Sequence, residues 1–134
     1  IAPVGKLTHP GEGENVPVEA QAADKPWQPR PYDGVELKLL HKDETTGGVT
    51  VLRKFAAGAI IPAHTHPLAN EWAYILSGDW EESEKLYTQG TLFHACKGER
   101  HGPHKANTEV ISLTHFDGPL TVEHPPFSPL RSLQ

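Results

Sequence analysis

The sequence predicts an all-β domain, built as a sandwich or a barrel. Short runs of strand length recur from residue 34 to residue 122, and residues that suit a chain reversal separate them. No helical stretch lies between these runs, which argues against an α/β fold. The 13 prolines and 12 glycines among 134 residues agree with many short elements joined by turns.

Length and charge limit what the chain can do. A chain of 134 residues is long enough for one core and too short for two. Its 12 basic and 17 acidic residues give a net charge of −5 and are mixed along the sequence, so we expect no nucleic-acid partner. The longest apolar stretch, residues 55–61, is far shorter than the roughly twenty residues of a membrane-spanning helix. We therefore predict one soluble domain that binds neither nucleic acid nor a membrane.

The single cysteine, Cys96, excludes an intrachain disulfide. The fold must then depend on its core or on a metal, and we expect a reducing compartment, the cytoplasm. The chain contains no Met and begins at Ile1, which leaves the processing of its N terminus open.

Composition divides the chain into three regions. Residues 1–33 are rich in proline, glycine and charge with little periodicity, and we predict an extended arm there, with free disorder as the alternative. Trp27 would anchor this arm on a sheet or on a partner subunit. Residues 34–123 form the predicted barrel, and residues 124–134 form a C-terminal tail.

Seven strands are predicted within the barrel. Each is a run of apolar or β-branched residues between turn signals such as Gly47-Gly48 and Asp117-Gly118-Pro119. The predicted strands cover residues 35–41, 49–55, 71–76, 85–87, 91–95, 109–116 and 120–122.

A cluster of metal-binding residue types lies in the middle of the chain. His64 and His66 are two residues apart, which on a β-strand directs both imidazoles to the same face. Glu71 follows five residues later, and the intervening turn at residues 67–70 can return its carboxylate to that face. His101 must come from a separate hairpin. Three imidazoles and one carboxylate suit one divalent transition metal, with Fe, Mn, Ni, Zn, Co and Cu all compatible, and leave positions for water or substrate.

The spacing of these residues resembles the two sequence motifs of the cupin superfamily, in particular small RmlC-like monocupins. The first motif consists of Gly58, His64, His66, Glu71 and Gly78, and the second of Gly90, Cys96, Gly98 and His101. Cys96 stands where cupins usually have Pro, and Lys105 stands where they usually have Asn. The resemblance covers residues 49–116 and implies a double-stranded β-helix, or jelly-roll barrel, with His64, His66, Glu71 and His101 as metal ligands.

Several further side chains are candidates for the pocket. On its predicted strand His94 could face the barrel interior, and it is either a proton acceptor or a buried histidine. His115 is likewise either a pocket residue or part of the core. His104 is expected on a loop or at the surface. Arg53 could reach an anionic substrate if its strand face points inward.

Three functions are compatible with this pattern. The leading hypothesis is a non-haem dioxygenase, with Fe(II) favoured, that cleaves a small diketone, hydroxy-ketone or phenolic compound with O2. In that hypothesis Glu71 tunes the charge of the metal, and His94 or His115 accepts the substrate proton. The second is a redox-neutral isomerase, lyase or decarboxylase acting on a sugar acid or keto acid. The third is a binding or sensing module.

Self-association is a separate expectation that follows from the resemblance. Cupins commonly pair through sheet faces and N-terminal arms, so we expect a homodimer or a higher homo-oligomer.

Overall fold

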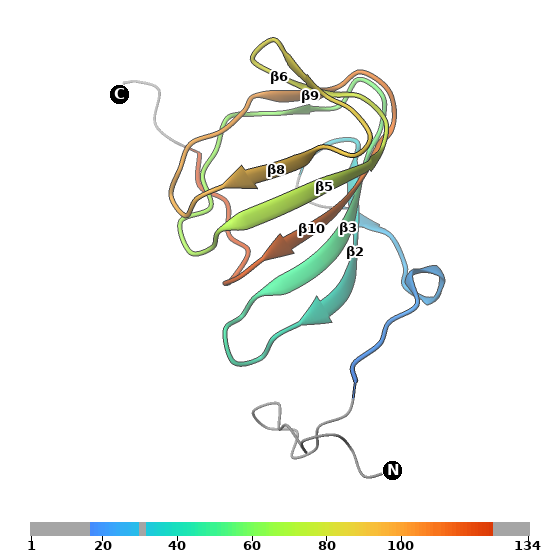
Figure 1. The fold of residues 1–134 in the computed structure, drawn as a ribbon, viewed down its shortest axis with the longest axis vertical. Helices are drawn as coiled ribbons and strands as arrows, with labels where there is room; N and C mark the ends of the chain where they lie inside the picture. The colour runs from blue at the N-terminus through green and yellow to red at the C-terminus, as the bar shows by residue number, and fades with distance from the viewer. Residues whose placement is uncertain (1–16, 30–31, 125–134) are drawn as a thin grey trace.

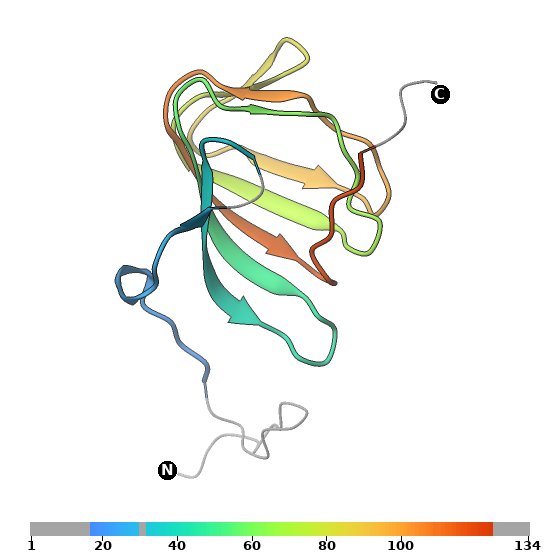
Figure 2. The same cartoon turned by 180° about the vertical axis from the view of Figure 1, so that it is seen from behind.

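The computed structural model describes residues 17–29 and 32–124 and confirms the predicted all-β jelly-roll fold. Two antiparallel sheets face each other, as the two opposite views show (Figures 1 and 2). The larger sheet has the order β1-β2-β3-β10-β5-β8, and the smaller has the order β4-β9-β6-β7. No described residue belongs to an α-helix.

The strands are short, as the turn-rich sequence predicts. The larger sheet is formed by β1 (Gln28–Pro29), β2 (Val35–Lys42), β3 (Val49–Phe55), β10 (Val110–Phe116), β5 (Glu71–Ser77) and β8 (Leu92–Ala95). The smaller sheet is formed by β4 (Ile60–Ile61), β9 (His104–Ala106), β6 (Trp80–Glu82) and β7 (Lys85–Tyr87). The 3-10 turn η2 (Ala22–Asp24) precedes them.

Alternation along the strands places the core between the sheets. On β10, Val110 and Phe116 are buried on the inner face whereas Leu113 and His115 are exposed on the outer face. One cluster of buried side chains packs around Phe55 and Trp80, whose rings lie 4.4 Å apart. Burying each large apolar side chain contributes about 1.5–3 kcal/mol, so this inner face accounts for much of the stability.

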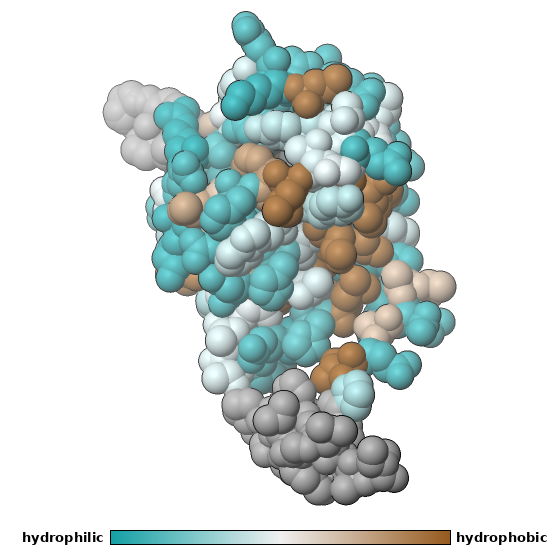
Figure 3. Space-filling view, in the orientation of Figure 1, coloured by the Kyte–Doolittle hydropathy of each residue, from teal (hydrophilic) through white to brown (hydrophobic). Residues whose placement is uncertain are grey.

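The outer face of the larger sheet carries an apolar row. Leu113 on β10 pairs with Tyr74 on β5, which pairs in turn with Leu92 on β8. All three are exposed, and Figure 3 shows apolar surface over these strands.

A backbone constraint explains the glycine that ends the first motif. Gly78 has φ +94°, a conformation that side-chain-bearing residues rarely adopt. A Cβ atom there would also collide with the carbonyl oxygen of Glu109. Only glycine allows the turn between β5 and β6 to pass this close to the start of β10.

The strand predictions are correct for five of the six strands of the larger sheet and incomplete in the smaller one. Strands β1, β4, β6 and β9 are missed, because each is only two or three residues long and shows no alternation by itself. Residues 120–122 do not form the predicted strand. They run beside residues 65–66 instead, where Glu123 and Thr65 exchange backbone hydrogen bonds of 2.8 and 3.0 Å.

The predicted arm and tail are only partly described. Residues 1–16, 30–31 and 125–134 lie outside the described part of the chain. Within the described arm, β1 adds to the edge of the sheet beside β2. The ring of Trp27 lies beneath the ammonium groups of Lys38 and Lys54, at 4.8 and 4.5 Å, as expected of an anchor. No described helix is long and apolar enough to cross a membrane.

Candidate metal centre

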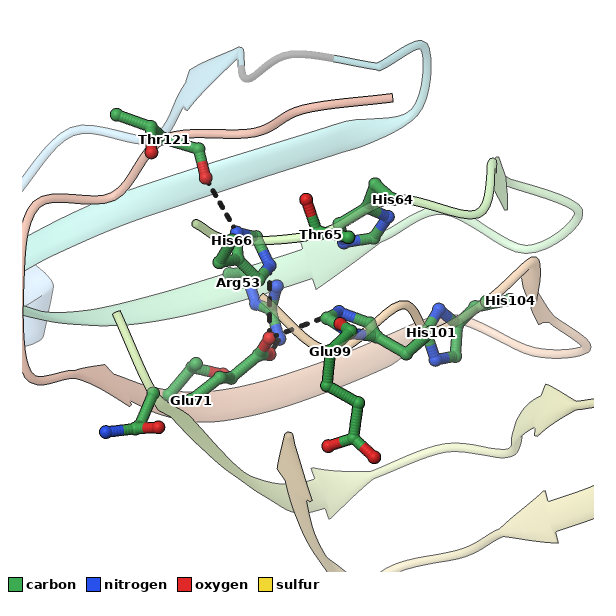
Figure 4. A network of polar contacts seen from close by, with 12 residues as sticks. Arg53, His64, Thr65, His66, Glu71, Glu99, His101, His104 and Thr121 are labelled. Atoms are coloured by element: carbon green, nitrogen blue, oxygen red, sulfur yellow. Dashed lines mark hydrogen bonds and ion pairs between the residues drawn. The ribbon is translucent and has the colours of Figure 1, made fainter. Parts of the chain in front are cut away.

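Two separate segments bring three histidines together (Figure 4). His64 and His66 lie on an extended segment before β5, and His101 lies in the connection between β8 and β9. His64 and His101 exchange two backbone hydrogen bonds of 2.9 and 3.0 Å, which fix the two segments against each other. Each of these side chains is buried, with exposures of 4%, 4% and 7%.

The three imidazoles converge on one point. One ring nitrogen from each lies within 4.8 Å of the others. His64, His66 and His101, three of the four ligands that the sequence predicts, can therefore hold a metal ion.

Backbone carbonyls orient all three rings. The Nδ1 atoms of His64, His66 and His101 donate to the carbonyl oxygens of Pro62, Thr121 and Glu99, at 2.7, 2.9 and 3.2 Å. A carbonyl oxygen only accepts hydrogen bonds, so Nδ1 carries the proton and Nε2 keeps its lone pair. This second layer of contacts is typical of metal-binding histidines.

Glu71, at the start of β5, lies beside two of the three histidines. Its Oε1 lies 3.2 Å from Nε2 of His66 and 3.5 Å from Nε2 of His101. Its other oxygen, Oε2, accepts a hydrogen bond of 2.8 Å from Nη2 of Arg53, so the side chain of Arg53 points inward. Arg53 therefore forms an ion pair with a carboxylate of the protein itself, whereas the sequence suggested an anionic substrate as its partner.

Burial and neighbouring charges set the protonation of the cluster. Burial is the main reason that the pKa of His64 falls to about 4, with smaller contributions of the same sign from His101 and His66. For Glu71, burial alone would raise the pKa. The charge of Arg53 outweighs it, with smaller contributions from the neighbouring His101 and His66, so the pKa lies well below its usual value. A neutral imidazole beside a carboxylate anion is the state that binds a metal.

The buried polar atoms at the centre fit a metal ion. Nε2 of His66 and Oε1 of Glu71 are both buried without a hydrogen-bond partner. Ligand atoms about 2.1 Å from a shared metal and at right angles around it lie about 3 Å apart. The separations of 3.2 and 3.5 Å agree with this geometry. The role of Glu71 as a fourth ligand remains a prediction.

A cavity of about 360 Å³ opens onto the cluster. Its walls are mostly apolar and come from both sheets and from the segment after β10. The apolar lining residues are Val35, Leu37, Leu39, Val49, Val51, Phe55, Ile61, Phe93, Phe116, Leu120 and Val122. Its size and its few convergent polar groups are typical of a small-molecule site.

His104 is a pocket residue that sequence reasoning placed incorrectly on a loop or at the surface. It lies on β9, is 4% exposed and lines the cavity. Its Nε2 is 3.3 Å from Oε1 of Glu82, whose other oxygen accepts a hydrogen bond of 2.6 Å from the backbone of Gly102. The three-residue spacing from His101 suggested opposite faces. The turn at Gly102 breaks that alternation.

His94 and His115 face away from the cavity, against the expectation that one of them would contact substrate. Both are exposed on the outer face of the larger sheet. The ring of His94 stacks on Trp72 at 4.8 Å, and its Nδ1 donates to the backbone carbonyl of Glu71. His115 hydrogen bonds to Thr50 at 2.9 Å. Both are paired with Trp72, an outward residue, in the strand register, which fixes their orientation.

A β-barrel of two facing sheets with this histidine cluster inside it defines a cupin. Comparison with known families agrees, because the sequence model of the ChrR cupin-like domain matches residues 15–121. The chain belongs to the ChrR cupin-like domain family. A comparison with curated proteins gave no match.

Solved structures show the same fold. A "putative acetylacetone dioxygenase" from Methylibium petroleiphilum is 21% identical, with a TM-score of 0.72 over 84% of this chain and 85% of the other. An acetylacetone dioxygenase from Acinetobacter johnsonii is 19% identical, with a TM-score of 0.63 over 77% and 74%. The complex of SigE with the anti-sigma ChrR from Rhodobacter sphaeroides contains a chain 20% identical, with a TM-score of 0.61 over 72% and 52%. At these identities the similarity establishes the shared fold.

Proposed function

We propose that this protein is a non-haem Fe(II) dioxygenase that cleaves a small diketone, hydroxy-ketone or phenolic compound. The observation that carries the proposal is the position of three carbonyl-oriented imidazoles at an apolar cavity of about 360 Å³. Acetylacetone dioxygenases among the structures with this fold support the substrate class.

The chemistry of the cavity wall favours this substrate class over a sugar acid. Outside the histidine cluster and its Arg53–Glu71 pair, the lining residues with polar side-chain atoms are Gln28, Tyr32, Trp80 and His104. A polyhydroxylated substrate would leave many hydroxyl groups without partners, at a cost of about 1–3 kcal/mol for each buried group. A compact diketone has only two oxygens, and both could be satisfied at the metal.

One group of residues at the site would hold the metal, and a second group would exclude water from it. His64, His66 and His101 would hold the ion through Nε2, with Glu71 as the fourth ligand. The ion would supply Lewis-acid stabilisation of an enolate oxygen and a site for O2. The rings of Phe116 and Phe93 lie against His66 and His101, at centroid distances of 5.0 and 5.5 Å, and would keep water from the centre. Because His94 and His115 lie on the outer face, neither is placed to accept the proton that a diketone loses.

An oxygen electrode tests this proposal. Full-length protein reconstituted with Fe(II) should consume O2 in the presence of acetylacetone or a catechol, and His64→Ala should abolish the uptake. His94→Ala removes a histidine from the outer face. It is the matched control and should retain O2 uptake. Stoichiometric iron without uptake on a diketone and phenol panel would contradict the proposal. Anaerobic turnover of a keto acid or sugar acid would support the redox-neutral alternative.

A sensing module is the second candidate function, and family membership favours it. The chain belongs to the ChrR cupin-like domain family, and a ChrR structure of the same fold is an anti-sigma protein in complex with SigE. Such a module would use the same metal centre for binding, without turnover. Metal-dependent capture of a protein partner, combined with no O2 uptake, would favour it.

Self-association is also proposed here. The exposed row of Leu113, Tyr74 and Leu92 offers an uncharged surface that a second copy could cover. Light scattering should give the mass of a dimer, and a monomeric mass would exclude it.

A further inference from the structure

We propose that Arg53 is a positioning residue of the metal centre, which binds one oxygen of Glu71 and so leaves only the other oxygen for the ion. The two oxygens of this carboxylate have different surroundings. Oε2 accepts the hydrogen bond from Arg53 at 2.8 Å, whereas Oε1 is buried, lacks a hydrogen-bond partner and faces the imidazoles. The inference rests on the proposed function only through its metal centre.

The fold gives Arg53 a clear path to Glu71. Arg53 lies on β3 and Glu71 on β5, and β10 runs between them. The inner face of β10 carries the small side chains of Ser112 and Thr114, which are fully buried and hydrogen bond to each other at 3.0 Å. Because these side chains are short and satisfy each other, the long side chain of Arg53 can cross the inner face to Glu71.

The guanidinium of Arg53 is held in place by aromatic rings. Its Cζ atom lies 5.3, 5.6 and 5.8 Å from the ring centroids of Phe55, Trp80 and Phe116. The side chain is only 13% exposed, and that of Glu71 is 3% exposed. In the described part of the chain, Glu71 is the one carboxylate within ion-pair distance of Arg53. A buried cation is costly unless it is paired, so this ion pair fixes both partners.

The pairing has a consequence for the ligand set. A carboxylate with one oxygen held by a cation offers the ion a single oxygen donor, and three imidazoles add three nitrogen donors. Positions for substrate then remain on a five- or six-coordinate metal. If both oxygens of Glu71 were available, the carboxylate could chelate the ion and occupy one of those positions.

Infrared difference spectroscopy on Zn(II) binding tests this division. Zn(II) is added to the metal-free full-length protein, and the separation between the two carboxylate stretching bands of Glu71 reports whether one or both oxygens bind. Glu71→Gln identifies the bands by removing them. Because Zn(II) does not react with O2, the result is independent of whether the protein is a dioxygenase.

The wild-type protein should show the wide separation of a one-oxygen ligand, and Arg53→Met should narrow it as the second oxygen binds. Arg53→Lys keeps a cation and should restore the wide separation. Lys54→Met removes a cation from the outer face of the same strand and should match the wild type.

An unchanged wide separation in Arg53→Met would overturn the proposal. A narrow separation in the wild type would overturn it as well, and that measurement does not depend on whether any variant folds. Absence of Glu71 bands in the wild-type difference spectrum would also exclude Glu71 as a ligand, and with it the role of Arg53.

Discussion

Histidines lie on both sides of the larger sheet, but their surroundings differ. On the inner side His64, His66 and His101 are buried, and their Nδ1 atoms are bound by backbone carbonyls, so Nε2 of each is available to a metal. On the outer face His94 and His115 are exposed and contact Trp72. His94 even shares the Nδ1-to-carbonyl bond of the inner histidines.

The comparison shows that the orientation of the backbone decides the role of a histidine here. His94 and the three buried histidines all have Nδ1 bound to a backbone carbonyl. Only in the buried three does the other ring nitrogen lie close to further ligand atoms. A shift of one residue in strand register would exchange the two faces.

The largest difference is expected in metal binding. His101→Ala removes one of three convergent nitrogens, and we expect its affinity for Fe(II) or Zn(II) to fall by at least about 100-fold, beyond the effect usual for an outer-shell residue. His94→Ala should bind metal as the wild type does, because its ring lies on the other face. Chelator competition measures both affinities. Equal losses in the two variants would contradict the comparison.

Substitutions on the inner and outer faces of β10 should also differ in their effect on stability. Phe116 on the inner face of β10 is 0% exposed, and Phe116→Ala should lower the free energy of unfolding by about 3–5 kcal/mol. Leu113 on the outer face is 38% exposed, and Leu113→Ala should cost less than about 1 kcal/mol. Urea denaturation of the metal-free variants, at protein concentrations where light scattering gives a monomer, provides both values. Equal costs for the two substitutions in the monomer would contradict the difference between the faces.

The smallest effect concerns the acid stability contributed by Glu82 on the smaller sheet. Its hydrogen bond from His104 is the main reason that its pKa falls to about 2, and the backbone bond from Gly102 acts in the same direction against burial. Because this pKa is below the usual 4.5, the contribution is complete above pH 4.5 and is lost as the pH falls through about 2.

Glu82→Gln should therefore flatten the pH dependence of unfolding between pH 4.5 and about 2, and should cost about 1 kcal/mol at pH 7. Glu81→Gln, a substitution at the neighbouring position on β6, is the control and should keep the acid transition. Identical acid profiles for the wild type and Glu82→Gln would exclude the contribution.

Local sequence patterns were sufficient for His64 and His66 and for five of the six strands of the larger sheet, whereas His101 was identified from its place in the second motif. The two-residue spacing of His64 and His66 and the run of alternating residues around Glu71 are properties of neighbouring positions. The orientations of His94 and His115 depend instead on their register with Trp72 on another strand. Register is set by long-range pairing, so it could not be obtained from spacing along the chain.

The contacts of Arg53 and His104 could not be predicted from the sequence, because they too depend on long-range strand pairing. Arg53 meets Glu71 from a strand two places away in the sheet, and His104 meets Glu82 across the pair of β9 and β6. The short strands of the smaller sheet carry too few residues to reveal a period. The sequence leaves the inward position of Arg53 as one of two alternatives, and only the fold identifies its partner.

His64, His66 and His101 are proposed to hold one metal ion in the space between the two sheets. X-ray absorption spectroscopy on protein loaded with one equivalent of Fe(II) tests this proposal most directly, because imidazole rings give a distinct scattering signal. We expect three imidazoles on the iron, and two in His101→Ala when it is loaded at high metal concentration. A wild-type spectrum with no imidazole scattering, or one unchanged by His101→Ala, would contradict the account.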